Sequence, residues 1–159
     1  MRTLVLSAML ALGAAGILPA ADSFKLTIGN PIAVMLPAPG TSSNVVNKKF
    51  LAQFVVRGDG CTDSSVFRIT GTAEGLVDGT RQSLPLAIVE VPSFPGVYGV
   101  RKTWPAQGDW IAVLTGRCRD ATAAAIVPIK NDGFLREAIR FYSRAATPAE
   151  IESALKAMK

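Results

Sequence analysis

The stretch FPGVYGVRKTWPAQGDWIAVLT, residues 94–115, carries the clearest indication of fold class in this chain. It holds two short runs rich in β-branched and aromatic residues, Val97–Trp104 and Trp110–Thr115, separated by the turn-forming residues Pro105–Gly108. Runs of this length bounded by Pro and Gly are typical of antiparallel strands. The stretch therefore predicts a β-hairpin that turns at Gly108.

The same pattern extends on both sides of this stretch. Turn signals recur about every ten residues, among them Asp78-Gly79, and no helical period separates the runs. Pro85 interrupts one run, which indicates an edge strand or the beginning of a strand. Further strands are predicted over Phe24–Ile28, Ile32–Leu36, Phe50–Val56, Val66–Thr72, Leu84–Val91 and Ala123–Ile129.

Short strands at this spacing predict an antiparallel β-sandwich rather than an α/β fold. Alternation along the runs predicts which side chains face the core. The inward-facing set is Phe54, Val56, Phe67, Ile69, Ile88, Tyr98, Val100, Trp110, Ala112 and Leu114.

The chain changes character after residue 130. Apolar residues then recur at helical spacing in two segments, and Thr147-Pro148-Ala149-Glu150 is a capping box with proline at the first helical position. Residues 131–159 therefore read as a helical hairpin that either covers an edge of the sandwich or docks on a partner. The apolar residues are Leu135, Ala138, Ile139 and Tyr142 in the first segment, and Ile151, Ala154, Leu155 and Met158 in the second.

Residues 1–21 are predicted to be a secretory signal peptide. Arg2 precedes an apolar run of about 15 residues and the small residues Ala20 and Ala21. The run is shorter than the ~20 residues of a membrane-spanning helix, although an uncleaved anchor is the alternative. Cleavage would lower the formal charge from +5 to +4. The remaining chain would begin with a β domain over 22–130 and would have no transmembrane segment. We therefore expect the protein in the periplasm or outside the cell.

The two cysteines, Cys61 and Cys118, lie 57 residues apart. In an exported protein an even number of cysteines predicts a disulfide. Two separate buried thiols or a redox pair are the alternatives, although redox cysteines usually form a C-x-x-C motif.

The sequence contains no histidine. This excludes Ser-His-Asp triads and Cys-His dyads, and two cysteines cannot form a four-cysteine zinc site. We therefore expect no enzymatic activity, no metal and no cofactor. A hydrolase using two carboxylates is the alternative, with Glu74, Glu90 and Asp109 as candidates.

Four residues are candidates for ligand binding. Arg136, Arg140 and Arg144 lie at i, i+4 and i+8 of the first predicted tail helix, where they would form a basic stripe for phosphate, an acidic peptide or a membrane surface. A solvated helix face is the alternative. Trp104 would suit a sugar or peptide if exposed. The stripe has no interleaved aromatic residues, so nucleic acid is not expected as a partner.

The motif Phe94-Pro95-Gly96-Val97-Tyr98, followed by Gln107-Gly108-Asp109-Trp110-Ile111, has the form P-G-x-Y … G-x-W. It resembles the C-terminal hairpin of immunoglobulin-like extracytoplasmic bacterial domains of the YtkA-like type, over residues 45–116. The resemblance implies an immunoglobulin-like fold and an exported accessory or binding role. Some relatives handle metals, but a chain without histidine is a poor match for a copper site.

These observations together predict a disulfide-linked, immunoglobulin-like antiparallel β-sandwich with a C-terminal helical hairpin. The expected function is that of an exported, non-enzymatic binding or accessory protein of the bacterial cell envelope. Its partner would be another exported protein or an anionic ligand. The alternative is a structural or assembly module that docks through its tail.

Overall fold

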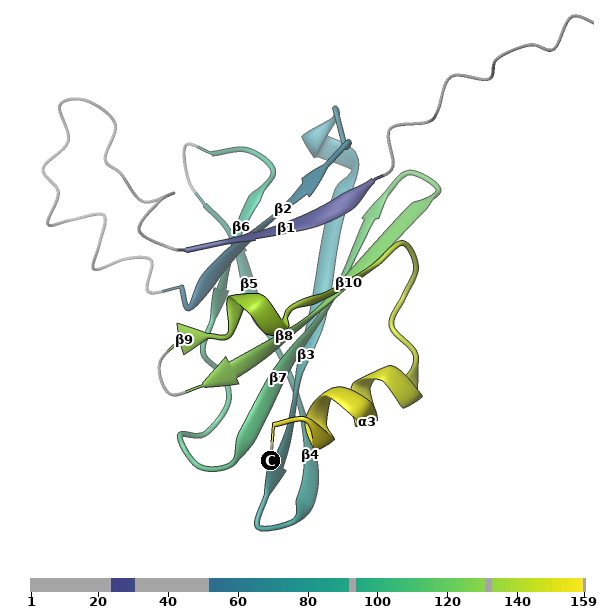
Figure 1. Ribbon diagram of the computed structural model, residues 1–159. Coiled ribbons are helices and arrows are strands. Elements are labelled where there is room, and N and C mark those ends of the chain that lie inside the picture. Colours follow the sequence, from purple (N-terminus) through teal and green to yellow (C-terminus); the bar gives the residue numbers. More distant parts are fainter. Residues whose placement is uncertain (1–23, 31–51, 92–93, 131–132, 159) are drawn as a thin grey trace, which may run out of the picture.

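The computed structural model describes residues 24–30, 52–91, 94–130 and 133–158. They form two antiparallel sheets (Figure 1), one in the order β1-β2-β6-β5 and the other in the order β10-β8-β7-β3-β4, with β9 paired to β8. The strands are β1 (Lys25–Gly29), β2 (Phe54–Asp59), β3 (Phe67–Val77), β4 (Thr80–Pro85), β5 (Ala87–Glu90), β6 (Val97–Arg101), β7 (Asp109–Cys118), β8 (Ala121–Lys130), β9 (Gly133–Phe134) and β10 (Arg140–Tyr142). The predicted strand at 32–36 and the signal peptide lie outside the described residues.

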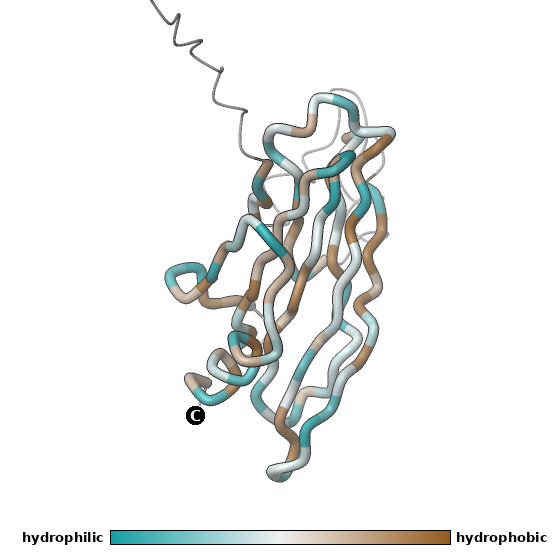
Figure 2. Tube along the Cα trace, turned by 90° about the vertical axis from the view of Figure 1, so that its right-hand side faces the viewer, coloured by the Kyte–Doolittle hydropathy of each residue, from teal (hydrophilic) through white to brown (hydrophobic). Residues whose placement is uncertain are grey.

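The two sheets face each other across a shared hydrophobic core. In Figure 2 they appear as two layers, with hydrophobic and hydrophilic segments interspersed along the strands. The prediction of the inward-facing residues is confirmed, because each of them is buried or packs against the core. Phe54, Val56, Phe67, Val100, Trp110, Ala112 and Leu114 are buried, and Ile69, Ile88 and Tyr98 are partly buried.

The predicted turn at Asp78-Gly79 is confirmed, and so is the edge position of Pro85, but the single strand predicted over Leu84–Val91 is wrong because it is divided between the two sheets. Asp78 and Gly79 have φ angles of 49° and 78° and join β3 to β4, as expected for a tight hairpin turn. Pro85 ends β4, and Leu86 alone separates it from β5 in the other sheet. Both β4 and β5 are edge strands, where the missing N–H of proline costs no ladder bond.

The predicted hairpin at Gly108 is wrong. The two strands it would join, β6 and β7, belong to different sheets, and residues 102–108 cross from one sheet to the other. Gly108 does reverse the chain, with φ of 88°, and a Cβ there would lie 2.5 Å from the Leu76 carbonyl oxygen. A turn signal shows that the chain bends, but it does not show which strands pair afterwards.

The first helix of the predicted tail hairpin is also wrong. Arg136–Ala138 forms a single 3₁₀ turn, η2, and the backbone becomes extended at Ile139 before β10 pairs with β8. The segment Ile139–Tyr142 is rich in β-forming side chains, and the edge of β8 offers unpaired backbone groups, so tertiary pairing overrides the helical spacing.

The second predicted helix is confirmed as α3 (Pro148–Lys156), with Thr147 as its N-cap and a complete capping box. Its apolar side covers the outer face of the second sheet, since Ala154 and Leu155 are buried against Ile111, Val113 and Ile126. Figure 1 shows α3 beside the lower part of this sheet. The tail thus covers the sheet, and the apolar side of α3 faces inward. Within the described ranges, no helix has the length and apolar character needed to cross a membrane.

Candidate functional site

The disulfide between Cys61 and Cys118 is present, with the two Cα atoms 5.8 Å apart. Cys61 follows β2 of the first sheet and Cys118 ends β7 of the second. The bond therefore joins the two sheets covalently at one end of the molecule, which confirms the predicted pairing. Both cysteines of the chain are used, so neither supplies a free thiol for redox or nucleophilic chemistry.

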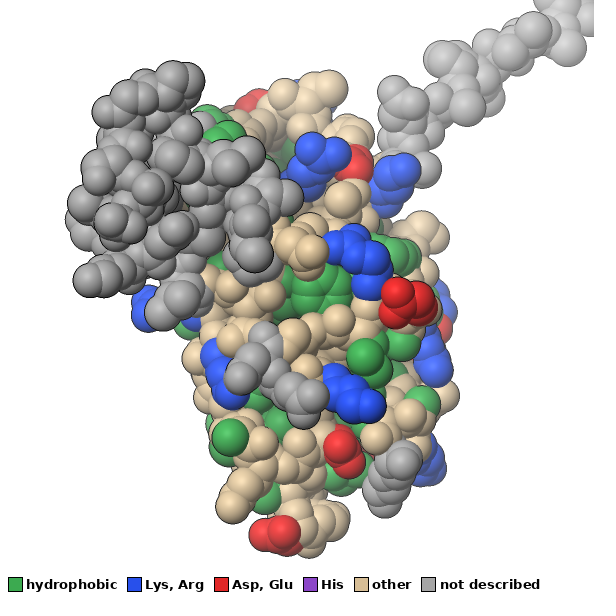
Figure 3. Space-filling model, turned by 60° about the vertical axis from the view of Figure 1, so that its left-hand side comes forward, with side chains coloured by type: hydrophobic (Ala, Val, Ile, Leu, Met, Phe, Trp, Pro, Cys, Tyr) green, Lys and Arg blue, Asp and Glu red, His purple; other side chains and the backbone are tan. Residues whose placement is uncertain are grey.

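The predicted basic stripe does not exist, because Arg136, Arg140 and Arg144 lie on η2, on β10 and in the loop before α3. Arg136 stands 5.4 Å from the ring centre of Phe134, and Arg140 donates to Ser153 Oγ at 3.4 Å. On the face drawn in Figure 3, basic and acidic side chains are interspersed with uncharged ones rather than gathered in one basic patch.

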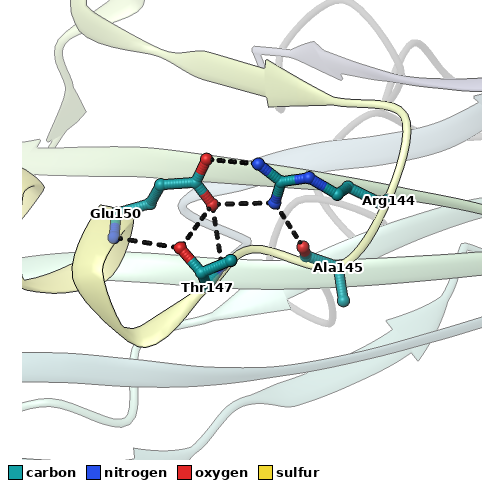
Figure 4. Close-up of polar contacts among 4 residues, drawn as sticks. All are labelled: Arg144, Ala145, Thr147 and Glu150. Carbon is teal, nitrogen blue, oxygen red and sulfur yellow. Dashed lines mark hydrogen bonds and ion pairs between the residues drawn. The ribbon is translucent and has the colours of Figure 1, made fainter.

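Arg144 is held by the cap of α3 (Figure 4). Its guanidinium forms two hydrogen bonds, of 2.9 and 2.7 Å, to the carboxylate of Glu150, which also accepts from the Thr147 backbone N–H at 2.7 Å. The bond from Arg144, followed by that from Thr147, lowers the pKa of Glu150 to about 2. The guanidinium therefore stabilises the start of the helix, as in a bidentate ion pair.

Trp104 is not an exposed binding residue. Its side chain is only 5% exposed and belongs to the core between the sheets. Trp110 is 2% exposed, and its ring N–H donates to the Gln107 carbonyl oxygen at 2.7 Å. Neither indole ring is displayed for stacking on a sugar or peptide.

A different group of polar side chains shares the outer face of the second sheet, at the end near the disulfide. We call it the arginine–threonine face, and it consists of Arg68, Thr70, Thr115, Arg117 and Thr122. The register places Arg68 opposite Arg117, Thr70 opposite Thr115, and Arg117 opposite Thr122. These residues alternate with inward-facing core residues, so their side chains project from the outer face of the second sheet. This is the same face that α3 covers further along the strands.

The two arginines of this face are an unusual cross-strand pair. Like charges directly opposite each other destabilise a sheet, and both side chains are exposed. Arg68 donates to the carbonyl oxygens of Ser65 and Phe67 at 2.7 and 2.9 Å, which fixes its guanidinium. No ion pair found within the described residues involves either arginine. The face therefore carries two positive charges and three hydroxyl groups.

Sequence reasoning missed the arginine–threonine face because it depends on strand pairing. Each strand shows the pattern locally, as Arg68-Ile69-Thr70 and as Thr115-Gly116-Arg117. Alternation alone puts Arg and Thr of each triplet on the same side of their strand. Only the register between β3 and β7 brings the two arginines together.

Two of the candidate catalytic carboxylates have structural partners. Glu74 is 6% exposed and accepts hydrogen bonds from Thr72 Oγ1 at 2.8 Å, Ser83 Oγ at 2.6 Å and Arg81 at 3.3 Å. Glu90 accepts from the Gly96 backbone N–H at 3.0 Å. In the part of the chain that the structure describes, no group of three or more Cys, Asp or Glu side chains is placed to hold a metal ion.

Comparison with known proteins gives no relative for this chain: no family model, no curated protein and no solved structure matches it.

Proposed function

We propose that the protein is an exported, non-enzymatic binding or accessory protein of the bacterial cell envelope, and that it binds an anionic ligand on the arginine–threonine face. The observation that carries this proposal is the direct opposition of Arg68 and Arg117 on neighbouring strands. Such a pair costs stability and forms no ion pair within the described chain. A local arrangement that works against folding is a sign of function.

The chemistry of the face suits an oxyanion. Guanidinium groups form charge-assisted, often bidentate hydrogen bonds with phosphate, sulfate or carboxylate. The adjacent threonines, Thr70, Thr115 and Thr122, can donate further hydrogen bonds to the same oxygens. A bound anion would also offset the repulsion between the two arginines, so binding and stability are linked.

Export is supported by the disulfide and by the signal-like sequence of residues 1–21. Disulfides persist in oxidising compartments such as the periplasm and are rare in the cytosol. The formal positive charge of the chain agrees with an anionic ligand, although charge alone selects none.

We also propose an immunoglobulin-like topology, in keeping with the resemblance to YtkA-like domains. Lettered as in immunoglobulins, β1-β2-β6-β5 would be A-B-E-D, and β8-β7-β3-β4 would be G-F-C-C′. Cys61, just after strand B, and Cys118, at the end of strand F, would then correspond to the B–F disulfide of antibody domains, displaced to the ends of the two strands. The chain departs from that pattern in its two tryptophans, because Trp110 stands at the start of strand F and Trp104 in the connection before it, and neither lies on strand C.

The test is an NMR titration with sodium pyrophosphate at low ionic strength. We expect saturable shifts of backbone amides in β3, β7 and β8, and at least tenfold weaker binding by the R68Q/R117Q variant. That loss corresponds to roughly 1.4 kcal/mol or more, as expected when charged hydrogen bonds disappear. The matched control is R101Q/K130Q. It also removes two positive charges, but at the last residues of β6 and β8, away from the arginine–threonine face.

Two outcomes would count against the proposal. One is an equal loss of binding in both double variants, which would indicate a nonspecific charge effect. The other is a wild-type titration without saturation. Unfolding by urea serves as a check that the variant is folded. R68Q/R117Q removes a repulsion but also the hydrogen bonds from Arg68 to the Ser65 and Phe67 carbonyl oxygens, so its stability should stay close to that of the wild type.

A further inference from the structure

A second candidate binding site lies on the first sheet, independent of the arginine–threonine face. Two cavities adjoin there and share Arg57 and Val97 in their walls. One, of about 290 Å³, is lined mainly by apolar side chains, including Val55 and Phe94. The other, of about 480 Å³, is lined mainly by polar groups of the loop that follows β2. We call the pair of cavities the Arg57 groove.

Arg57 is held in place at the junction of the two cavities. Its Nε lies 2.9 Å from one carboxylate oxygen of Asp59, and the other oxygen of Asp59 accepts a hydrogen bond from Thr27 Oγ1 on β1. The shortest contact of the ion pair is made by Nε, no hydrogen bond of the terminal nitrogens is found among the described residues, and the Arg57 side chain is 59% exposed. The two terminal nitrogens are the donors that remain for a ligand.

The charge around Arg57 favours an anion. Asp59 neutralises one positive charge, but Lys25 lies directly across from Asp59 on β1. Lys25, Arg57 and Asp59 therefore carry one net positive charge at this edge of the groove. A carboxylate would be attracted there, and the planar guanidinium matches its geometry.

The apolar side of the groove has a fixed wall. Phe94 is 39% exposed, and its turn is closed by a hydrogen bond from the Val97 N–H to the Phe94 carbonyl oxygen at 3.0 Å. Glu90 supports the same turn by accepting from the Gly96 N–H. A preformed wall of this kind reduces the ordering cost of binding, and an exposed aromatic ring gains free energy when a ligand covers it.

We infer that the Arg57 groove binds a small carboxylate with an apolar body. The carboxylate would pair with the terminal nitrogens of Arg57, and the body would lie against Val55, Phe94 and Val97. The smaller cavity is close to the lower limit of ordinary small-molecule sites, about 300 Å³, so the body is short. Apolar walls with one oriented charged group are the usual composition of such sites.

The test uses sodium octanoate as the probe, below the concentration at which it forms micelles, with backbone amide NMR of the full chain. We expect saturable shifts in β2 and residues 94–97. Acetate, which lacks the body, and 1-octanol, which lacks the charge, should each bind at least tenfold more weakly. R57Q should weaken octanoate binding at least tenfold, whereas R101Q should leave it unchanged.

Equal binding of octanoate and 1-octanol, unchanged binding by R57Q, or no saturable octanoate shift would each overturn the inference. F94A is the second variant, because it keeps the ion pair of Arg57 and removes only the exposed ring; it should also weaken octanoate binding. R68Q/R117Q should bind octanoate like the wild type, so a failure at this site and a failure at the arginine–threonine face can be told apart.

Discussion

Glu74 shows how a single polar residue can stabilise this fold. Glu74 is the one buried charged residue among those that the structure describes. Its carboxylate accepts hydrogen bonds from three side chains of β3 and β4. One of them, Arg81, also lies 3.4 Å from Glu152 on α3. Glu74 therefore links two strands of the second sheet to the helix that covers it.

We expect E74A to lower the free energy of unfolding by about 1–3 kcal/mol, because it leaves the hydroxyls of Thr72 and Ser83 without their acceptor. The measurement is urea denaturation followed by tryptophan fluorescence. E90A is the control: Glu90 is exposed and has one described hydrogen bond, so its loss should cost less. Equal costs for the two variants would contradict a special role for Glu74.

Residue by residue, the sequence predicts burial well where alternation is regular. The inward-facing residues of the predicted set follow from the period of two alone. The burial of Trp104 was harder to predict, because this residue lies in the connection between β6 and β7, where the period of two does not apply. The opposition of Arg68 and Arg117 could not be predicted either, since it depends on the register between two strands about 50 residues apart.

Among the elements, α3 has a stability that depends on pH. The folded-state pKa of Glu150 is about 2, below its ordinary value of 4.5, because Arg144 and Thr147 donate to its carboxylate. Because the pKa is lowered on folding, the ionised Glu150 carboxylate contributes to stability. This contribution is complete above about pH 4.5 and is lost as the pH falls toward 2.

We therefore expect α3 to loosen on acidification through this range, with an NMR titration midpoint for the Glu150 side chain near pH 2. Amide exchange at residues 148–156 should accelerate between pH 4.5 and 2, beyond the intrinsic change in exchange rate. E150Q should remove most of this additional acceleration. A midpoint near 4.5 for Glu150 would show that the cap does not form in solution.

The two tail segments explain why one helix was predicted correctly and the other was not. The correct one has local signals that act together: Thr147 as cap, Pro148 at the first position and Glu150 closing the box. The wrong one had apolar spacing and a candidate cap at Asn131 or Asp132, which lie outside the described residues; the 3₁₀ turn that forms instead has Leu135 at its N-cap position, with no side-chain cap. The apolar spacing of this segment was outweighed by pairing with the available edge of β8.

For the molecule as a whole, the disulfide is the main covalent constraint. Removing it by C61A/C118A should lower the free energy of unfolding by about 4 kcal/mol in the chain-entropy model, because the bond closes a loop of 57 residues. Thermal or urea unfolding of the variant measures the loss. Reduction of the wild type should have a similar effect, and stability unaffected by either change would refute this estimate.

The two-layer architecture could be predicted from the sequence, but the assignment of strands to layers could not. The resemblance around residues 94–110 suggested a hairpin, whereas β6 and β7 lie in different sheets. Turn residues act locally, whereas the choice of sheet depends on packing between distant parts of the chain, and Trp104 of this connection is one of the residues buried between the layers. The same limit applies to both proposed sites, which depend on neighbours brought together by strand pairing.

The position of the cystine has a consequence for the motions of the molecule. It joins the sheets next to Asp59 and Arg117, whereas Trp104 closes the opposite end through noncovalent contacts alone. Transient opening of the native state should therefore begin at the Trp104 end and pivot about the cystine. Arg68, Arg117 and Arg57 lie near the pivot, so both proposed ligand sites should keep their geometry while the far end fluctuates.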